Sequence, residues 1–293
     1  MTSALFVGLS TLDIAYAVDR YPGEDTKTQA TDQFIGAGGP AANAAVAYAI
    51  VTGGHRPTLI TALGGHPLAD LVRHDLCAHH VEVVDATPGH LAQPPVSSIV
   101  VALDAQSRTI VGLDAARIHA LFTAELAQHI DHASVVLVDG HHPDLALGIT
   151  RCANEAGVPV VLDAGRWKPI HDDLLPLVDT VICSSAFAPP GFDGDTNTLL
   201  EYLRSVGPKR VAVTRGREPI LYATDGQHGA IDIAAVSYAD TLGAGDILHG
   251  AFCAYYEPGR DFVDALTRAS AVATLSCRTF GTRSWAGSLS ELR

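Results

Sequence analysis

The stretch Asp240-Thr241-Leu242-Gly243-Ala244-Gly245-Asp246 is the most informative part of this sequence. Small residues allow backbone N–H groups to approach an anion closely, and the positive end of a helix dipole favours negative charge at the same point. We therefore expect Gly243, Ala244 and Gly245 to form an anion hole. The pattern predicts a glycine loop that opens a buried helix, because apolar residues follow at helical spacing: Ile247, Leu248, Ala251 and Phe252.

Asp246 falls in the first turn of the predicted helix, beside the predicted anion hole. A carboxylate at that point can accept the proton of an attacking alcohol, which is the general-base role that phosphoryl transfer to a hydroxyl requires. The alternative is a carboxylate that only complements the helix dipole, as many first-turn acidic residues do. Asp246 is our candidate for the catalytic base.

A second glycine segment runs from Gly36 to Asn43 and reads Gly-Ala-Gly-Gly-Pro-Ala-Ala-Asn. Pro40 suits the first position of a helix and Gly53 suits a stop after it. Asn43 could point its amide at ligand hydroxyls, or it could satisfy a nearby backbone group. The segment also matches the G-x-G-x-x-A pattern of dinucleotide-binding enzymes, but only weakly, because no predicted strand directly precedes the glycines. The sequence contains no Walker-A motif.

Short apolar runs rich in Val and Ile alternate with segments of helical period. Runs of this kind are typical of strands buried on both faces, and the alternation predicts an α/β fold with a mostly parallel, doubly wound sheet. The predicted helices include 68–80 and 144–156. The predicted strands are 4–9, 59–63, 135–138, 158–162, 180–183 and 210–214.

Two regions interrupt this alternation, namely 13–35 and 96–113. In the second, SSIVVAL and RTIVGL flank Asp104-Ala105-Gln106-Ser107, which predicts a hairpin with a four-residue turn. The two regions could form a small accessory sheet, or the hairpin could lie on the edge of the main sheet. The pattern alone favours neither.

Composition limits the classes of partner. The chain of 293 residues carries a net charge of −13, which repels nucleic acid and anionic membrane surfaces, so we expect neither as a partner. An anionic cosubstrate such as ATP must then be held by local N–H groups and a few basic side chains. The five cysteines show no CxxC spacing and none of the 14 histidines has the spacing of a zinc site. We expect a cytoplasmic protein, because the sequence shows neither an export signal nor a long apolar segment.

The two glycine segments, in this order and with Asp13 upstream, resemble the PfkB, or ribokinase-like, carbohydrate kinase family. The element at 240–246 is highly specific for that family, and the resemblance extends over essentially the whole chain. It implies one ribokinase-like domain over 1–293, with a three-layer α/β fold, a mostly parallel central sheet and a small β-sheet lid from about 13–35 and 96–113. It also implies phosphorylation of a hydroxyl of a small sugar by in-line transfer from Mg-ATP, with Asp246 as the base.

The resemblance also implies binding residues. Sugar hydroxyls would be held by Asp13, Gly38, Gly39 and Asn43. ATP would be held by Thr214, Arg215 and Gly216 together with Gly243, Gly245, Ser276 and Gly281. A monovalent cation such as K⁺ could bind the backbone carbonyls of Asp240, Leu242, Ser276, Thr279 and Gly281.

One departure from the family concerns magnesium. Where the family often has an Asn-x-x-Glu element, this chain reads Cys183-Ser184-Ser185-Ala186-Phe187 and has no carboxylate. Ketohexokinase-like members also lack the Asn, and GlyGlyProAlaAla and AspIleLeuHisGly resemble the branch that contains sulfofructose kinase. We therefore expect a ketose or ketose-like substrate. Arg108, Arg166 and His141 are candidates for an acidic substituent, with surface salt bridges as the alternative.

Two other functions remain open at this point. A nucleoside kinase would have the same fold, and a sugar-binding pseudokinase would explain the missing Asn-x-x-Glu, although the intact Asp246 argues against it.

We expect a homodimer joined through the lid. The 96–113 hairpin is too small to bury two faces by itself, and lid-mediated dimers recur in the family that the chain resembles. The apolar residues expected to take part are Ile99, Val100, Val101, Ile110 and Val111.

Overall fold

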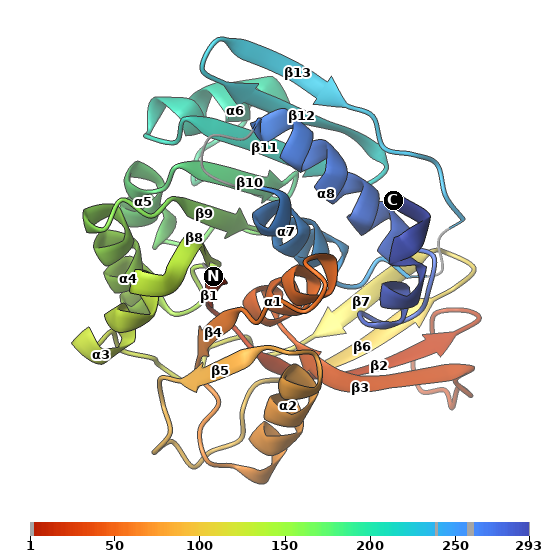
Figure 1. The fold of residues 1–293 in the computed structure, drawn as a ribbon. Helices are drawn as coiled ribbons and strands as arrows, with labels where there is room; N and C mark the ends of the chain where they lie inside the picture. The colour runs from red at the N-terminus through yellow and green to blue at the C-terminus, as the bar shows by residue number, and fades with distance from the viewer. Residues whose placement is uncertain (1–2, 238–239, 257–260, 293) are drawn as a thin grey trace.

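The computed structural model describes residues 3–237, 240–256 and 261–292. It shows a nine-stranded central sheet with helices on both faces and a separate four-stranded sheet beside it (Figure 1). The predicted α/β architecture, with three layers and a small second sheet, is therefore the observed one. No helix in the described ranges is long and apolar enough to cross a membrane.

The central sheet has the strand order β13-β12-β11-β10-β9-β8-β1-β4-β5. Neighbours from β11 to β5 pair in parallel, and β12 and β13 add an antiparallel edge. The predicted runs are all strands of this sheet, with bounds that differ by a few residues. The strands are β1 (Ser3–Val7), β4 (Thr58–Thr61), β5 (Glu82–Asp85), β8 (Ala133–Val138), β9 (Val160–Ala164), β10 (Thr180–Ser184), β11 (Arg210–Arg215), β12 (Glu218–Thr224) and β13 (Gln227–Ile231).

Side chains of the central strands enter two cores, one on each face of the sheet. In β1, Ala4 and Phe6 pack into one core while Leu5 and Val7 pack into the other. The first core is covered by α1 (Pro40–Val51), α2 (Pro67–Ala78), α7 (Ala244–Tyr255), α8 (Phe262–Ser276) and η3 (Ser284–Leu292). The second is covered by α3 (Ala124–Ala127), η1 (Gln128–His132), α4 (Pro143–Glu155), α5 (His171–Leu174), η2 (Leu175–Leu177) and α6 (Thr196–Ser205).

The second sheet combines the two regions that interrupt the α/β alternation. Its strand order is β3-β2-β6-β7, so the hairpin is not on the edge of the central sheet, and that alternative is wrong. Ser107 already belongs to β7, so the turn comes one residue earlier than predicted. The strands are β2 (Thr11–Val18), β3 (Asp32–Gly38), β6 (Val96–Ala102) and β7 (Ser107–Val111).

The second sheet has one buried face. Ile99 and Val101 lie on it, each 1% exposed, and pack with Ala15 and Leu242. The prediction that Ile99 and Val101 are free to meet a partner is therefore wrong, because the alternation of β6 turns them toward this chain's own core. Val111 on β7 remains 68% exposed.

Helices α1 and α7 pack with their backbones in close approach. A Cβ added at Gly250 would lie only 2.1 Å from the Ala44 carbonyl oxygen, so glycine is needed at this crossing. The crossing sets the distance between the beginnings of the two helices, each of which follows one of the glycine segments. Asn43 and Asp246 consequently meet across the gap between α1 and α7.

Candidate active site

A cleft of about 1630 Å³ lies between the carboxyl edge of the central sheet and the second sheet. Ligands of open α/β sheets usually bind at this edge, at the point where the connections from two neighbouring parallel strands run in opposite directions. Residues that follow successive strands line it, including Leu9 after β1, Asp139 after β8 and Asp163 at the end of β9. The predicted site residues in its lining are Asp13, Gly39, Asn43, Arg108, His141, Arg166, Leu242, Gly243, Gly245 and Asp246.

The glycine loop turns sharply into α7 at Gly243. This residue is the N-cap and has φ 68°, in the left-handed region that favours glycine. A Cβ there would lie 2.9 Å from Thr282 Cγ2 and 3.4 Å from Asn43 Nδ2, whereas a Cβ at Gly245 would meet nothing within 4 Å. The loop is thus tightly packed on its inner side and open on its cleft side, as an anion hole requires.

Asp246 accepts a hydrogen bond from Asn43 Nδ2 at 2.8 Å through its Oδ2 atom. The pKa of Asp246 is raised to about 7, mainly by burial and then by the nearby charge of Asp163, while the Asn43 hydrogen bond and the charges of His249 and Arg108 oppose this shift. A carboxylate with a pKa near neutrality can both take and hold a proton, so Asp246 has the property expected of a general base.

The pH dependence of catalysis should report the titration of Asp246. Because a base must be deprotonated, we expect kcat/KM for the sugar to fall about tenfold per pH unit below its pKa of about 7. Initial rates across this range check it, and a sugar without an ionisable group separates titration of Asp246 from titration of the substrate. A rate that stays constant through two pH units below neutrality would contradict the assignment.

Asp13 lies on β2, 4% exposed, on the side of the cleft formed by the second sheet. Thr11 Oγ1 donates to its Oδ1 at 2.6 Å, and a Cβ at Gly38 would fall 1.9 Å from its Oδ2, so glycine at 38 makes room for the carboxylate. Burial raises the pKa of Asp13, against hydrogen bonds from Thr11 and Ser97 and the charge of Arg283. A buried acceptor of this kind suits a ligand hydroxyl.

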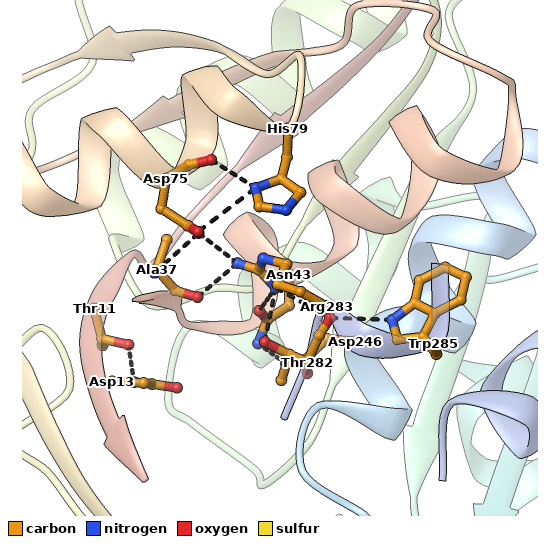
Figure 2. Close-up of polar contacts among 10 residues, drawn as sticks. All are labelled: Thr11, Asp13, Ala37, Asn43, Asp75, His79, Asp246, Thr282, Arg283 and Trp285. Atoms are coloured by element: carbon orange, nitrogen blue, oxygen red, sulfur yellow. Dashed lines mark hydrogen bonds and ion pairs between the residues drawn. The ribbon is translucent and has the colours of Figure 1, made fainter. Parts of the chain in front are cut away.

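Asn43 is held at both ends of its amide. Its Nδ2 donates to Asp246, and its Oδ1 accepts from Arg283 Nη1 at 3.0 Å (Figure 2). The expected bidentate contact between the Asn43 amide and a sugar is therefore not preformed, because Asp246 already uses one amide N–H and Arg283 already uses the amide oxygen. One N–H of the amide remains for a ligand.

The basic candidates lie at different places in the cleft. Arg108 Nη1 donates to Thr241 Oγ1 at 2.5 Å, which brings a charge from β7 to the glycine loop. His141 Nδ1 lies 3.2 Å from Asp139 Oδ1. Arg166 Nη2 lies 3.7 Å from Asp114 Oδ2 in a pair that is largely exposed. Arg108 is thus the one nearest the expected point of phosphoryl transfer.

Thr214, Arg215 and Gly216 lie at the carboxyl end of β11, on the same sheet edge as the cleft. The Thr214 carbonyl accepts from Ser185 N at 2.9 Å, and Arg215 pairs with Glu218 at 2.8 Å. Within the described ranges, the lining of the cleft that holds Asp246 does not include them, nor Ser276 or Gly281. Their role in ATP binding stays a prediction.

The segments expected to hold a monovalent cation are in contact with each other. The Asp240 carboxylate accepts from Leu242 N at 2.8 Å and from Gly281 N at 3.0 Å, which joins the glycine loop to the segment after α8. The Ser276 carbonyl accepts from Thr279 N at 3.4 Å. The described residues contain no cluster of three or more His, Cys, Asp or Glu side chains suited to a metal. Cation binding by these carbonyls stays a prediction.

Comparison with known proteins gives the family. Residues 1–286 match the pfkB family carbohydrate kinase. The chain belongs to this family. Among curated relatives, it is 30% identical over 297 residues to an ATP-dependent ribose-1-phosphate kinase of Halopiger xanaduensis, covering 97% of this chain and 95% of the relative. It is 25% identical to a ribokinase of Staphylococcus aureus, covering 94% of each chain.

The fold of this carbohydrate kinase is shared with solved structures. The structure of Arabidopsis thaliana ribokinase complexed with ribose and ATP superimposes with a TM-score of 0.77 at 22% identity, covering 99% of this chain and 98% of that one. The predicted ATP-dependent carbohydrate kinase is confirmed, and the dinucleotide-binding alternative is wrong. The relatives reported above do not place the chain in the ketohexokinase branch, since they are a ribose-1-phosphate kinase and a ribokinase.

Several cleft residues of this kinase were not identified from the sequence. Asp139 follows β8 and Asp163 lies at the end of β9, so the reasoning that selected His141 from its place at a strand end could have found them. Lys168 Nζ donates to the Asp139 carbonyl at 3.1 Å and carries no sequence signal of its own. Arg283, which contacts Asn43 from outside the cleft lining, follows Thr279-Phe280-Gly281-Thr282, and no pattern links it to a residue 240 positions earlier.

Proposed function

We propose that this carbohydrate kinase transfers the γ-phosphoryl group of ATP to a primary hydroxyl of a small sugar, with Asp246 as the base. One observation carries this proposal: Asp246, with its pKa raised to about 7, lies beside the glycine loop and lines the same cleft as Asp13 and Asn43. Base, anion hole and candidate hydroxyl ligands thus converge on one space.

The chemical step follows from this arrangement. Asp246 accepts the proton of the sugar hydroxyl while that oxygen attacks the γ-phosphorus, and the bond to the bridging oxygen breaks so that its electron pair leaves with ADP. Backbone N–H groups at 243–245 and the charge of Arg108 stabilise the negative charge that spreads over the transferring group.

The donor set of the cleft fits a magnesium nucleotide. Mg²⁺ prefers carboxylate oxygens, and Asp163 lines the cleft although residues 183–187 contain no carboxylate. The Oδ2 atom of Asp163 is buried, lies 3.3 Å from His249 Nδ1 and has no hydrogen-bond partner among the described residues. Asp163 would help to hold Mg²⁺, which when bound would neutralise the negative charge that develops on the transferring phosphoryl group.

We propose that the second sheet is the lid of the site. Arg108 reaches from β7 to Thr241, and Asp13 and Ser97 face the cleft from β2 and β6. A sugar bound against Asp13 would lie between this sheet and the glycine loop. Closure of the sheet would exclude water, which otherwise would accept the phosphoryl group.

Ribose-type sugars are the first candidate substrates. The two curated relatives described above are named for ribose and ribose 1-phosphate, and the cleft offers Arg166, Lys168 and His141 to an anionic substituent. The predicted preference for a ketose rests on short motifs and stays a prediction. We therefore propose ribose or ribose 1-phosphate, with ketoses and ketose phosphates as the second choice.

A substrate panel tests this proposal. ADP release by the purified protein would be measured with ribose, ribose 1-phosphate, ketoses, other aldoses and nucleosides, each with Mg-ATP. We expect the largest kcat/KM with ribose or its 1-phosphate. A preference for nucleosides would favour the nucleoside kinase, and binding without ADP release would favour the pseudokinase. The raised pKa of Asp246 argues for an active enzyme.

We also propose a homodimer through the outer face of the second sheet. Paired residues on neighbouring strands share one face of a sheet. The pairs Ile14↔Ile35, Ile14↔Ser98 and Ser98↔Val111 therefore form a row across the second sheet, on the face opposite the buried Ile99. Ile35 is 53% exposed and Tyr16, in the next row, is 40% exposed. A two-fold partner would cover this apolar face.

Charges on the outer face should separate the two protomers. We expect Ile35→Asp combined with Tyr16→Asp to give a monomer by light scattering at micromolar concentration, because both carboxylates would be buried in the interface. Leu91→Asp is the matched control, since Leu91 is 77% exposed and lies outside this sheet. A wild-type monomer would refute the dimer, and a dimer that survives the double substitution would refute this interface.

A further inference from the structure

Arg283 connects the C-terminal segment to α1, α2 and the end of β3. Its Nη1 donates to Asn43 Oδ1 at 3.0 Å and to Thr282 Oγ1 at 2.8 Å. Its Nη2 donates to the Ala37 carbonyl at 2.7 Å and to Asp75 Oδ2 at 3.0 Å. Figure 2 shows the resulting line of side chains from Asp75 through Arg283 and Asn43 to Asp246.

The position of Arg283 is fixed by its surroundings. Its side chain is 11% exposed, and Asp75 supplies the opposite charge from α2. The next turn is anchored by Trp285, which is fully buried and whose Nε1 donates to the Thr282 carbonyl at 3.0 Å. These contacts hold the guanidinium in place, and its planar set of donors fits several acceptors at once.

Arg283 also fixes the orientation of the Asn43 amide. A guanidinium has only donors, so the amide must present its oxygen to Arg283, and its nitrogen then faces Asp246. With the opposite orientation, two donors would meet at Arg283 and an amide oxygen would face the Asp246 carboxylate. The hydrogen bond from Asn43 to the base is thus determined by Arg283.

We propose that Arg283 is a positioning residue for the catalytic base, acting through Asn43. It sets the direction of the Asn43 N–H group, which holds the Asp246 carboxylate and stabilises its charged form. The C-terminal segment 282–285 is then part of the kinase mechanism. The alternative is a purely structural tie between this segment and α2.

Loss of Arg283 should change the titration of the base as well as the rate. In Arg283→Met the Asn43 amide can rotate, so its hydrogen bond to Asp246 weakens and the pKa of the base rises. We expect the acid limb of kcat/KM to move upward by roughly 0.5 to 1 pH unit. The rate at neutral pH should fall roughly 10- to 100-fold, because the base is less well oriented. KM for ATP should change little.

Three further variants separate positioning from folding. Arg283→Lys keeps the charge opposite Asp75 and should restore part of the rate, since one ammonium cannot serve all the acceptors. In an Asn43→Ala background, Arg283→Met should not move the acid limb again, because the amide that transmits the effect is gone. Arg204→Met is the matched control, because Arg204 on α6 also pairs with a carboxylate, that of Asp225 at 2.7 Å. This substitution should leave the pH profile unchanged.

The experiment is the pH profile of kcat/KM for the wild type, Arg283→Met, the three further variants and the Asn43→Ala single variant, with melting temperatures measured alongside. A lower rate in Arg283→Met with an unmoved acid limb would overturn the proposal and leave only the structural tie. An equal shift in the Asn43→Ala background would overturn the route through Asn43. The inference rests on Asp246 being the base. If Asp246→Asn were active, the proposed function itself would fail, whereas an inactive Asp246→Asn beside an unmoved acid limb would reject Arg283 alone.

Discussion

Replacing Asp246 with asparagine should lower turnover by roughly 100- to 10,000-fold, the range that a positioned general base contributes. The amide cannot take the proton of the sugar hydroxyl, although it fills the same space beside Asn43. ATP binding should persist, because the backbone N–H groups of the glycine loop are unchanged. Single-turnover rates and ATP titration by calorimetry would measure the two effects separately.

Asp264→Asn is the matched control for this prediction. Asp264 is the acidic residue in the first turn of α8, so it has the same relation to a helix dipole, and it does not line the cleft. We expect its activity to stay near that of the wild type. If the two variants had similar rates, Asp246 would only complement its helix dipole.

Gly243→Ala should lower kcat by roughly 100-fold or more, comparable to the loss of one oxyanion-hole donor. Gly243 has φ 68°, a backbone conformation that is unfavourable for a residue with a side chain. The new Cβ would also lie 2.9 Å from Thr282 Cγ2. Thr282 is 1% exposed and its Oγ1 accepts from Arg283, so it cannot turn away without breaking that contact. The glycine loop must shift instead, and its N–H groups move with it.

Gly226→Ala separates this crowding from backbone strain. Gly226 lies between β12 and β13 with φ 85°, and a Cβ there would meet nothing within 4 Å. We expect Gly226→Ala to lower the melting temperature slightly and to leave kcat unchanged. Steady-state kinetics on both variants would check the comparison, and a wild-type kcat in Gly243→Ala would show that the loop does not form the anion hole.

The sequence was sufficient for features that are local. Runs such as 180–183 and 210–214 are buried on both faces, so their composition identifies them as strands of a parallel sheet. The glycine loop and Asp246 are recognisable because a tight turn, a helix start and a carboxylate follow one another within seven residues.

Features that depend on distant segments could not be predicted in the same way. Arg283 reaches Asn43 across 240 positions of sequence, and only the packing of η3 brings them together. Ile99 and Val101 were predicted to lie in a dimer interface, but they are buried in this chain's own core. Alternation of apolar residues does not indicate which face of a strand the rest of the chain covers. The short motifs that suggested a ketose kinase do not describe the pocket, which side chains from both sheets line together.

The most direct test of the central claim is the identity of the product. The purified protein would be incubated with Mg-ATP and the best sugar of the panel, and the products followed by phosphorus and carbon NMR. We predict a new phosphomonoester on a primary carbon, formed at the rate of ADP release. In Asp246→Asn we predict that this rate falls by roughly 100-fold or more. Formation of inorganic phosphate without a sugar phosphate, or equal rates in wild type and Asp246→Asn, would contradict the account.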